Sequence, residues 1–134
     1  MTLVPFEFAV RDGFRALRSA RHGLADWLRG LNAAPEMIDD IQSAVGELAA
    51  NAVEASPDGH ADIRASIEDH CVRVVVSNEG PEPFTWPSSP APAQDPQATR
   101  GRGLRIASAL GDSLEVTTVR GRTEATFVRS LATA

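Results

Sequence analysis

The sequence predicts an α+β fold, a two-layer sandwich in which a mixed, mostly antiparallel sheet carries its helices on one face. Three observations set the fold class, the number of domains and the expected location, in that order. Helical and strand periodicities come in blocks rather than in strict alternation. The 134 residues, 43% of them hydrophobic, are enough for one domain with its own core, which we expect over 1–134. The single cysteine excludes an intrachain disulfide, as is typical of a cytoplasmic protein.

The N-terminal half contains one predicted strand and two predicted helices. Residues 2–10 favour an edge strand, because Pro5 lacks the donor that a central strand needs. Apolar residues recur at three- and four-residue steps over 11–31, which predicts an amphipathic helix. A proline in the first turn opens a second helix over 35–55, and the sequence SPDG at 56–59 is typical of a turn.

The C-terminal half is richer in strands. Alternating and valine-rich runs predict a hairpin linked by Asp69 and His70, and a helix with two more strands follows a long proline-rich segment. The predicted elements are strands at 61–68 and 71–77, a helix at 101–110 that begins with glycines, and strands at 113–119 and 123–131.

The segment 79–100 contains six of the nine prolines. Neither a long helix nor a strand is compatible with that composition. A loop of this length is uncommon inside a compact domain unless it is functional. The segment is therefore either a floppy linker or a loop with a function.

Composition excludes several function classes. All thirteen basic residues are arginine, so a P-loop, the ordinary protein-kinase fold and lysine-based catalysis are excluded. A formal net charge of −5 argues against nucleic acid as the main partner. No apolar run approaches the length needed to span a membrane.

The helix at 35–55 carries an unusual polar stripe. At ~100° per residue, the side chains of Asp40, Glu47, Asn51 and Glu54 fall on one narrow face. The stripe is either a solvated face or the wall of a cleft. In a cleft, Glu47 is suited to accept a proton or orient a nucleophile, and Asn51 offers a neutral oxygen to Mg²⁺.

The stretch 100–104, RGRGL, forms the second candidate site. Glycines at the start of a helix let backbone amides approach an anion, and the helix dipole favours negative charge at the same place. Arg100 and Arg102 add forked donors. On its own the pattern favours a flexible hinge followed by a helix N-terminus.

Taken together, these motifs resemble those of the anti-sigma-factor serine/threonine protein kinases, a small bacterial branch of the GHKL, or histidine-kinase-like, ATPases. Residues 47–53, ELAANAV, resemble the N box of that family. Residues 101–104, GRGL, resemble its second glycine box, and 121–123, GRT, its final glycine-threonine signature. The three motifs occur in the family's order at suitable spacing.

The resemblance implies an ATP-binding protein that uses Mg²⁺. It assigns Glu47 as the general base or water-positioning carboxylate and Asn51 as the metal ligand. The glycines at 101 and 103 would cradle the phosphates beside Leu104, and Thr123 would support the adenine pocket. The proline-rich segment 81–99 would form a lid over the bound nucleotide. The implied nucleotide-binding residues are Asn51, Asn78, Gly80, Arg100, Gly101, Arg102, Gly103, Leu104 and Thr123.

One motif departs from the family pattern. Asn78 stands at a predicted strand end where the family has an aspartate that accepts a hydrogen bond from the adenine amino group, and Glu82 stands where a second glycine is common. An asparagine oxygen also accepts that bond, but without charge. Because charge-assisted hydrogen bonds are roughly twice as strong, we expect ATP affinity to be lowered by about 1–2 kcal/mol relative to an aspartate.

The resemblance further implies partners. These are a small anti-sigma-factor antagonist that is phosphorylated on serine or threonine, a sigma factor held inactive, and a second copy in a homodimer. The expected location is the cytoplasm. The alternative, favoured by Asn78 and Glu82, is a non-catalytic nucleotide-binding or docking module of a partner-switching system.

Overall fold

The computed structural model describes residues 4–79 and 99–134, with the backbone alone for 99–103. In chain order, the described elements are strand β1 (Phe6–Val10), 3-10 helix η1 (Gly13–Ala16), helices α1 (Leu17–Gly30) and α2 (Pro35–Ala55), strands β2 (Ala61–Glu68) and β3 (Cys71–Glu79), helix α3 (Thr99–Leu110), and strands β4 (Ser113–Val119) and β5 (Arg122–Ser130).

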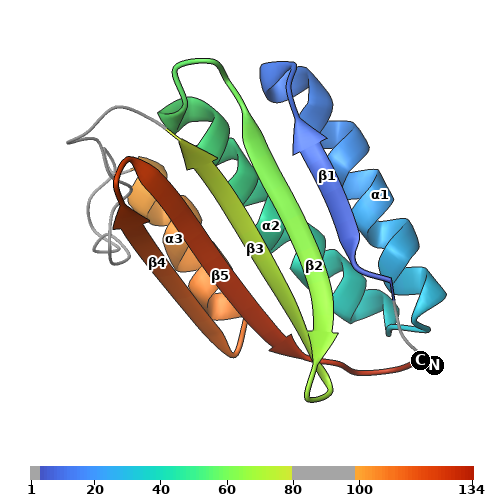
Figure 1. Ribbon diagram of the computed structural model, residues 1–134. Helices are drawn as coiled ribbons and strands as arrows, with labels where there is room; N and C mark the ends of the chain where they lie inside the picture. Colours follow the sequence, from blue (N-terminus) through green and yellow to red (C-terminus); the bar gives the residue numbers. More distant parts are fainter. Residues whose placement is uncertain (1–3, 80–98) are drawn as a thin grey trace.

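The described strands form one sheet in the order β1-β2-β3-β5-β4, and each neighbouring pair is antiparallel. The helices α1, α2 and α3 all lie on one face of this sheet (Figure 1). The predicted two-layer α+β architecture is therefore confirmed. After β5, the chain passes beside the α1–α2 loop, where Ala33 forms an isolated bridge with Thr133.

Two tight hairpins fix the strand register. Asp69 and His70 have φ angles of 51° and 62°, and Arg120 and Gly121 have 53° and 78°. Positive φ at both central residues defines a type I′ turn, whose twist matches that of antiparallel strands. Consequently Glu68 pairs with Cys71, as the sequence predicted for this hairpin.

The core lies between the sheet and the helices. Val72, Val74 and Val76 of β3 and Phe127 of β5 are fully buried beneath α2 and α3. Gly111, just after α3, lies so close to Phe127 that an added Cβ would come within 2.5 Å of Cε2. Close packing of α3 against the sheet therefore depends on a glycine at this position.

Element boundaries differ from the sequence prediction in places that matter for the site. The predicted helix over 11–31 begins as η1 and becomes α-helical only at Leu17, since Gly13 has a φ of 57°. Strand β3 extends beyond position 77 because Asn78 and Glu79 pair with β5. Helix α3 begins at Thr99 rather than at Gly101.

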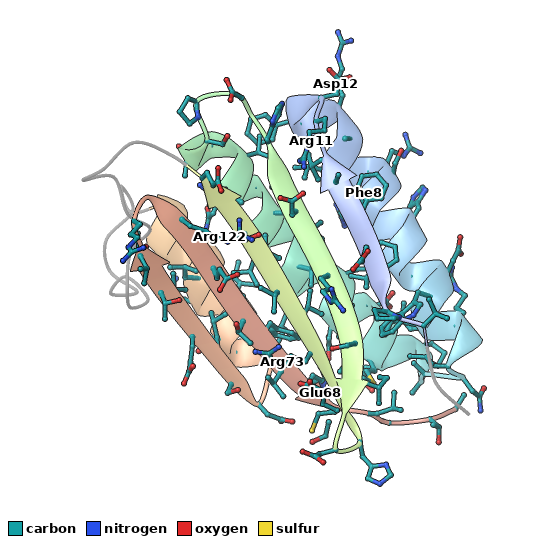
Figure 2. The ribbon with its side chains drawn as sticks, viewed as in Figure 1. Phe8, Arg11, Asp12, Glu68, Arg73 and Arg122 are labelled. Carbon is teal, nitrogen blue, oxygen red and sulfur yellow. The ribbon has the colours of Figure 1, made fainter. Side chains whose placement is uncertain are left out.

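The other face of the sheet has no helix over it in the described part of the chain and is lined with charge pairs. Arg73 lies 3.5 Å from Glu68, and the pair lies near one end of this face in Figure 2. At the opposite end Arg122 donates to Ser77 Oγ at 3.1 Å. No helix among the described residues is long and apolar enough to cross a membrane.

Candidate functional site

The polar stripe of α2 is divided between a structural contact and a recessed surface. Asn51 is only 7% exposed, Glu47 is half-buried, and Glu54 is exposed near the end of the helix. Asp40 Oδ2 instead accepts a 2.7 Å hydrogen bond from Arg129 Nη1 of β5. Asp40 therefore links α2 to β5, and this structural contact distinguishes it from the other residues of the stripe.

Arg129 sets the position of α3 relative to α2. The nitrogen that donates to Asp40 also donates to the backbone oxygen of Leu110 at 2.9 Å, at the C-terminal end of α3. A cation is favourable there because the last carbonyls of a helix lack partners and carry partial negative charge. The early part of α2 is thereby fixed beside the end of α3.

A second anchor fixes the same end of α3. Asp112 Oδ2 accepts hydrogen bonds from the backbone nitrogen of Ser130 at 2.6 Å and from its hydroxyl at 2.7 Å. These two hydrogen bonds, with a smaller contribution from Arg129, lower the pKa of Asp112 below its usual 3.8. With its end held twice, the direction of α3 is well defined.

This geometry brings the start of α3 level with Asn51. The two helices are in contact and run antiparallel (Figure 1). At 1.5 Å per residue, Asp40 to Asn51 advances about 16 Å along α2, and Leu110 back to Thr99 covers about the same length of α3. The turn of α2 that carries Asn51 therefore lies beside the first turn of α3.

The Asn51 side chain has an unmet hydrogen-bonding group. Its Nδ2 is buried and has no partner among the described residues. A buried, unpaired polar group costs about 1–3 kcal/mol, so such groups are rare and call for an explanation. A 180° rotation of the carboxamide exchanges its NH₂ and its oxygen. In one orientation Asn51 can donate to an anionic oxygen, and in the other its oxygen can bind a cation.

The residues therefore fit a Mg²⁺-bound phosphate group. The described residues contain no cluster of three or more histidine, cysteine or acidic side chains that would hold a metal by themselves. Mg²⁺ usually keeps several waters and takes one or two protein oxygens together with substrate phosphates. One recessed amide beside a helix start is a suitable protein contribution to such a site.

A second group of polar side chains, two of them buried, crosses the sheet. Asn78 of β3, Thr123 of β5 and Thr118 of β4 are successive partners in the strand register, and Asn78 and Thr123 are 5% and 2% exposed. The hydroxyls of Thr118 and Thr123 are 2.9 Å apart. We call these three residues the polar row.

The polar row lies at the end of the sheet where β3 ends and β5 begins. Helix α2 ends and α3 begins at this same end (Figure 1). The next row on the same face of the sheet, Val76, Ala125 and Val116, is apolar. The polar row therefore marks the boundary between the core and the end of the molecule at which Asn51 lies.

The glycine-rich stretch is part of α3 itself. Since the helix begins at Thr99, Gly101 falls in the first turn, whose amides lack intrahelical partners, and Gly103 lies in the second turn. The Leu104 side chain is 1% exposed and belongs to the core. Arg100 and Arg102 lie in the same turns, where the backbone alone is described. Gly80 and the predicted lid, apart from Thr99, lie outside the described residues.

Sequence reasoning missed two residues. Thr118 could have been found, because a two-residue turn at 120–121 places 118 opposite 123. Arg129 could not, because its partner Asp40 is 89 residues away and no local pattern links them.

The hollows found among the described residues lie away from Asn51. One of about 590 Å³ is lined largely by residues of the uncovered sheet face, among them Glu7, Arg64 and Arg122. A smaller one of about 170 Å³ borders Asn78 together with His60 and Arg122. Neither includes Asn51, so the recessed amide forms a separate feature.

Comparison with solved structures shows related architectures. The structure of the RsbU and RsbW domains of Rv1364c from Mycobacterium tuberculosis matches 96% of this chain with a TM-score of 0.74 and 26% identity, and this chain spans 32% of that longer one. The structure of the SiaB-SiaC complex from Pseudomonas aeruginosa matches 95% of this chain and 89% of the other with a TM-score of 0.64. At 12% identity, that likeness concerns the fold alone.

No curated protein sequence matches the chain significantly. Residues 11–129 match the profile of the histidine kinase-like ATPase domain. The matched range begins just after β1 and takes in α2, the polar row and α3. Because it covers most of the chain, the protein belongs to the histidine kinase-like ATPase domain family.

Proposed function

We propose that the protein binds ATP with Mg²⁺ and transfers the γ-phosphoryl group to a serine or threonine of a small antagonist protein. We propose further that the protein itself sequesters a sigma factor, in the cytoplasm. The observation that carries the proposal is the buried, unpaired amide of Asn51 beside the first turn of α3. An orphaned donor at a helix N-terminus is suited to a phosphate ligand. Family membership supports nucleotide binding.

Each residue has a distinct part in this mechanism. The backbone amides of the first turn of α3, including Gly101, would bind phosphate oxygens, and Asn51 would hold the metal-phosphate group. Mg²⁺, when bound, would neutralise phosphate charge. The polar row would face the base through Asn78 and Thr123.

The transfer itself would use Glu47. The hydroxyl oxygen of the substrate forms a bond to the γ-phosphorus, the bond from that phosphorus to the bridging oxygen breaks, and ADP leaves. The hydroxyl proton passes to the Glu47 carboxylate. Glu47 is half-buried one turn before Asn51 on the same face of α2, which supports its proposed role as the base.

The comparisons support a role with protein partners. One similar fold was solved as part of the SiaB-SiaC complex, and the other is the RsbW region of a chain that also contains RsbU. In both structures this fold occurs together with another domain or protein. For this chain, the antagonist, the sigma factor and a homodimer are proposals that rest on the resemblance of its motifs to anti-sigma-factor kinases.

The test combines binding with transfer. The purified protein is incubated with γ-labelled ATP, Mg²⁺ and a candidate antagonist, and label in the antagonist is measured. We expect transfer by the wild type, loss of transfer with retained ATP binding in Glu47→Gln, and loss of ATP binding in Asn51→Leu. Transfer that survives Glu47→Gln would exclude the assigned base, and unchanged ATP binding in Asn51→Leu would exclude the site.

A second candidate function is a docking module that binds nucleotide without turnover. Asn78 favours it, because the family's aspartate at this position is missing. In this case ATP changes the affinity for the partner, measured by calorimetry, but no label reaches the antagonist. Glu47→Gln would then leave both nucleotide and partner binding unaltered.

A further inference from the structure

We propose that this nucleotide site accepts both 6-amino and 6-oxo purines, so that GTP binds comparably to ATP. The inference rests on the proposed function, since it concerns which base the same site takes. It is carried by the polar row: in this part of the sheet the buried polar side chains are neutral, and each both donates and accepts hydrogen bonds.

The polar row lies at the edge of the core. Asn78 and Thr123 are directly opposite each other on neighbouring strands, and both are at least nine-tenths buried. The next row on the same face is apolar, so the polar row is the last polar group before the core on that face. A base bound at this end of the sheet would meet these side chains before the core.

The Asn78 carboxamide can both donate and accept hydrogen bonds. Adenine presents a donor at its 6-amino group and an acceptor at N1, whereas guanine presents an acceptor at its 6-oxo group and a donor at N1. A carboxamide matches either edge, because a 180° rotation exchanges its oxygen and its NH₂. It has two donor hydrogens and two acceptor lone pairs, so the polar interaction that Asn78 already makes leaves capacity for a base.

A carboxylate at the same position would behave differently. An ionised aspartate only accepts hydrogen bonds, so where it faces position 6 of the purine it matches the 6-amino group of adenine and repels the 6-oxo group of guanine. Asn78 removes that repulsion along with the charge. The same replacement that weakens the contact with adenine therefore also removes the discrimination against guanine.

The hydrogen bond between Thr118 and Thr123 is also reversible in direction. The Thr118 and Thr123 hydroxyls lie 2.9 Å apart, and either of them is able to donate to the other. Reversal of this hydrogen bond changes Thr123 from a donor to an acceptor toward the site. Among the described residues, the buried polar side chains are Asn51, Ser77, Asn78 and Thr123, so no buried carboxylate imposes one direction.

The experiment measures dissociation constants of ATP and GTP, each with Mg²⁺, by calorimetry on the wild type and on Asn78→Asp. We expect the two wild-type constants to agree within about ten-fold. Asn78→Asp should shift their ratio toward ATP by about ten-fold or more, because a charged hydrogen bond replaces a neutral one and the 6-oxo group is repelled.

A matched control places the same charge on the same strand but on the opposite face. Ser77→Asp faces Arg122, whose Nη2 lies 3.1 Å from the Ser77 hydroxyl, and should leave the ATP-to-GTP ratio unchanged. Circular dichroism and thermal unfolding of each variant establish that it is folded.

The outcomes separate this inference from the proposed function. If the wild type binds ATP more than a hundred-fold more tightly than GTP, the inference is wrong and the nucleotide site stands. If Asn78→Asp leaves the ratio unchanged, Asn78 does not read the base. If neither nucleotide binds to the wild type, both the inference and the proposed function fail.

Discussion

Replacing Asn51 by leucine should make the nucleotide-free protein more stable, against the usual direction of substitutions at buried sites. Leucine has nearly the same size and shape as asparagine but no polar atoms. The change removes an Nδ2 that is buried without a partner among the described residues. Asn51 is 7% exposed, so little hydration compensates this group.

The expected magnitude follows from that unmet hydrogen bond. An unsatisfied buried donor costs about 1–3 kcal/mol. Leucine is also the better helix former, by roughly 0.5 kcal/mol. We expect the free energy of unfolding to rise by about 1–3 kcal/mol, which corresponds to roughly 3–10 °C in Tm for a chain of this length.

The assay is thermal and urea unfolding with and without ATP and Mg²⁺. A ligand at a hundred times its Kd stabilises the folded state by about 2.7 kcal/mol, so the wild type should gain this amount. Asn51→Leu should gain nothing. The variant is then the more stable protein without nucleotide, and the advantage shrinks or reverses when ATP is saturating.

The matched control makes the same substitution at the other buried asparagine. Asn78 is 5% exposed but already has a polar partner. Asn78→Leu should therefore lower the free energy of unfolding by about 1–3 kcal/mol. A gain in Asn51→Leu no larger than the roughly 0.5 kcal/mol of helix propensity would refute the argument. So would an ATP-induced stabilisation equal to that of the wild type.

Three further predictions concern the placement of α3. Gly111→Ala should destabilise the fold by about 1–3 kcal/mol in urea unfolding, because the new Cβ would lie 2.5 Å from a ring atom of the fully buried phenylalanine of β5; an unchanged midpoint would contradict this packing. Arg129→Met should lower the free energy of unfolding by about 2–3 kcal/mol and weaken ATP binding, because the largely buried carboxylate of Asp40 and the backbone carbonyl of Leu110 both lose their hydrogen-bond donor. The control is Arg73→Met at an exposed ion pair, which should lower the free energy of unfolding by under about 0.5 kcal/mol. Equal losses of stability in the two variants would contradict the role given to Arg129. The pKa of Asp112 is lowered by hydrogen bonds from Ser130, so this contribution to stability is complete above the unfolded-state pKa of 3.8 and is lost as the pH falls through the lower folded-state pKa. Unfolding of Asp112→Asn across pH 2–6 should accordingly depend less on pH than that of the wild type, and parallel profiles would refute the assignment.

Much of the fold followed from local patterns. The valine-rich run of β3, the apolar period of α1 and the proline that opens α2 each act within a few residues, so the sequence indicated their type and approximate range. Boundaries were less predictable. β3 continues through Asn78 because β5 lies beside it, and α3 begins at Thr99 although its next residues include two glycines.

The chemistry of the candidate site was likewise visible in the sequence. Glu47 and Asn51 fall on one face of a helix by periodicity alone, and Asn78 and Thr123 occupy positions in recognisable motifs. The sequence could not decide whether the stripe on α2 faces solvent or a recess, since burial depends on elements distant in the chain.

The amino-acid sequence by itself therefore determined the types of the elements, their order and the residues able to carry chemistry, because periodicity and side-chain chemistry act within one turn or one strand. The tertiary structure decided that Asp40 belongs to a bridge with Arg129, that Asn51 is recessed without a partner, and that Asn78, Thr123 and Thr118 form one row. These facts depend on strand register and helix packing, which join residues up to 89 positions apart and leave no local signal in the chain.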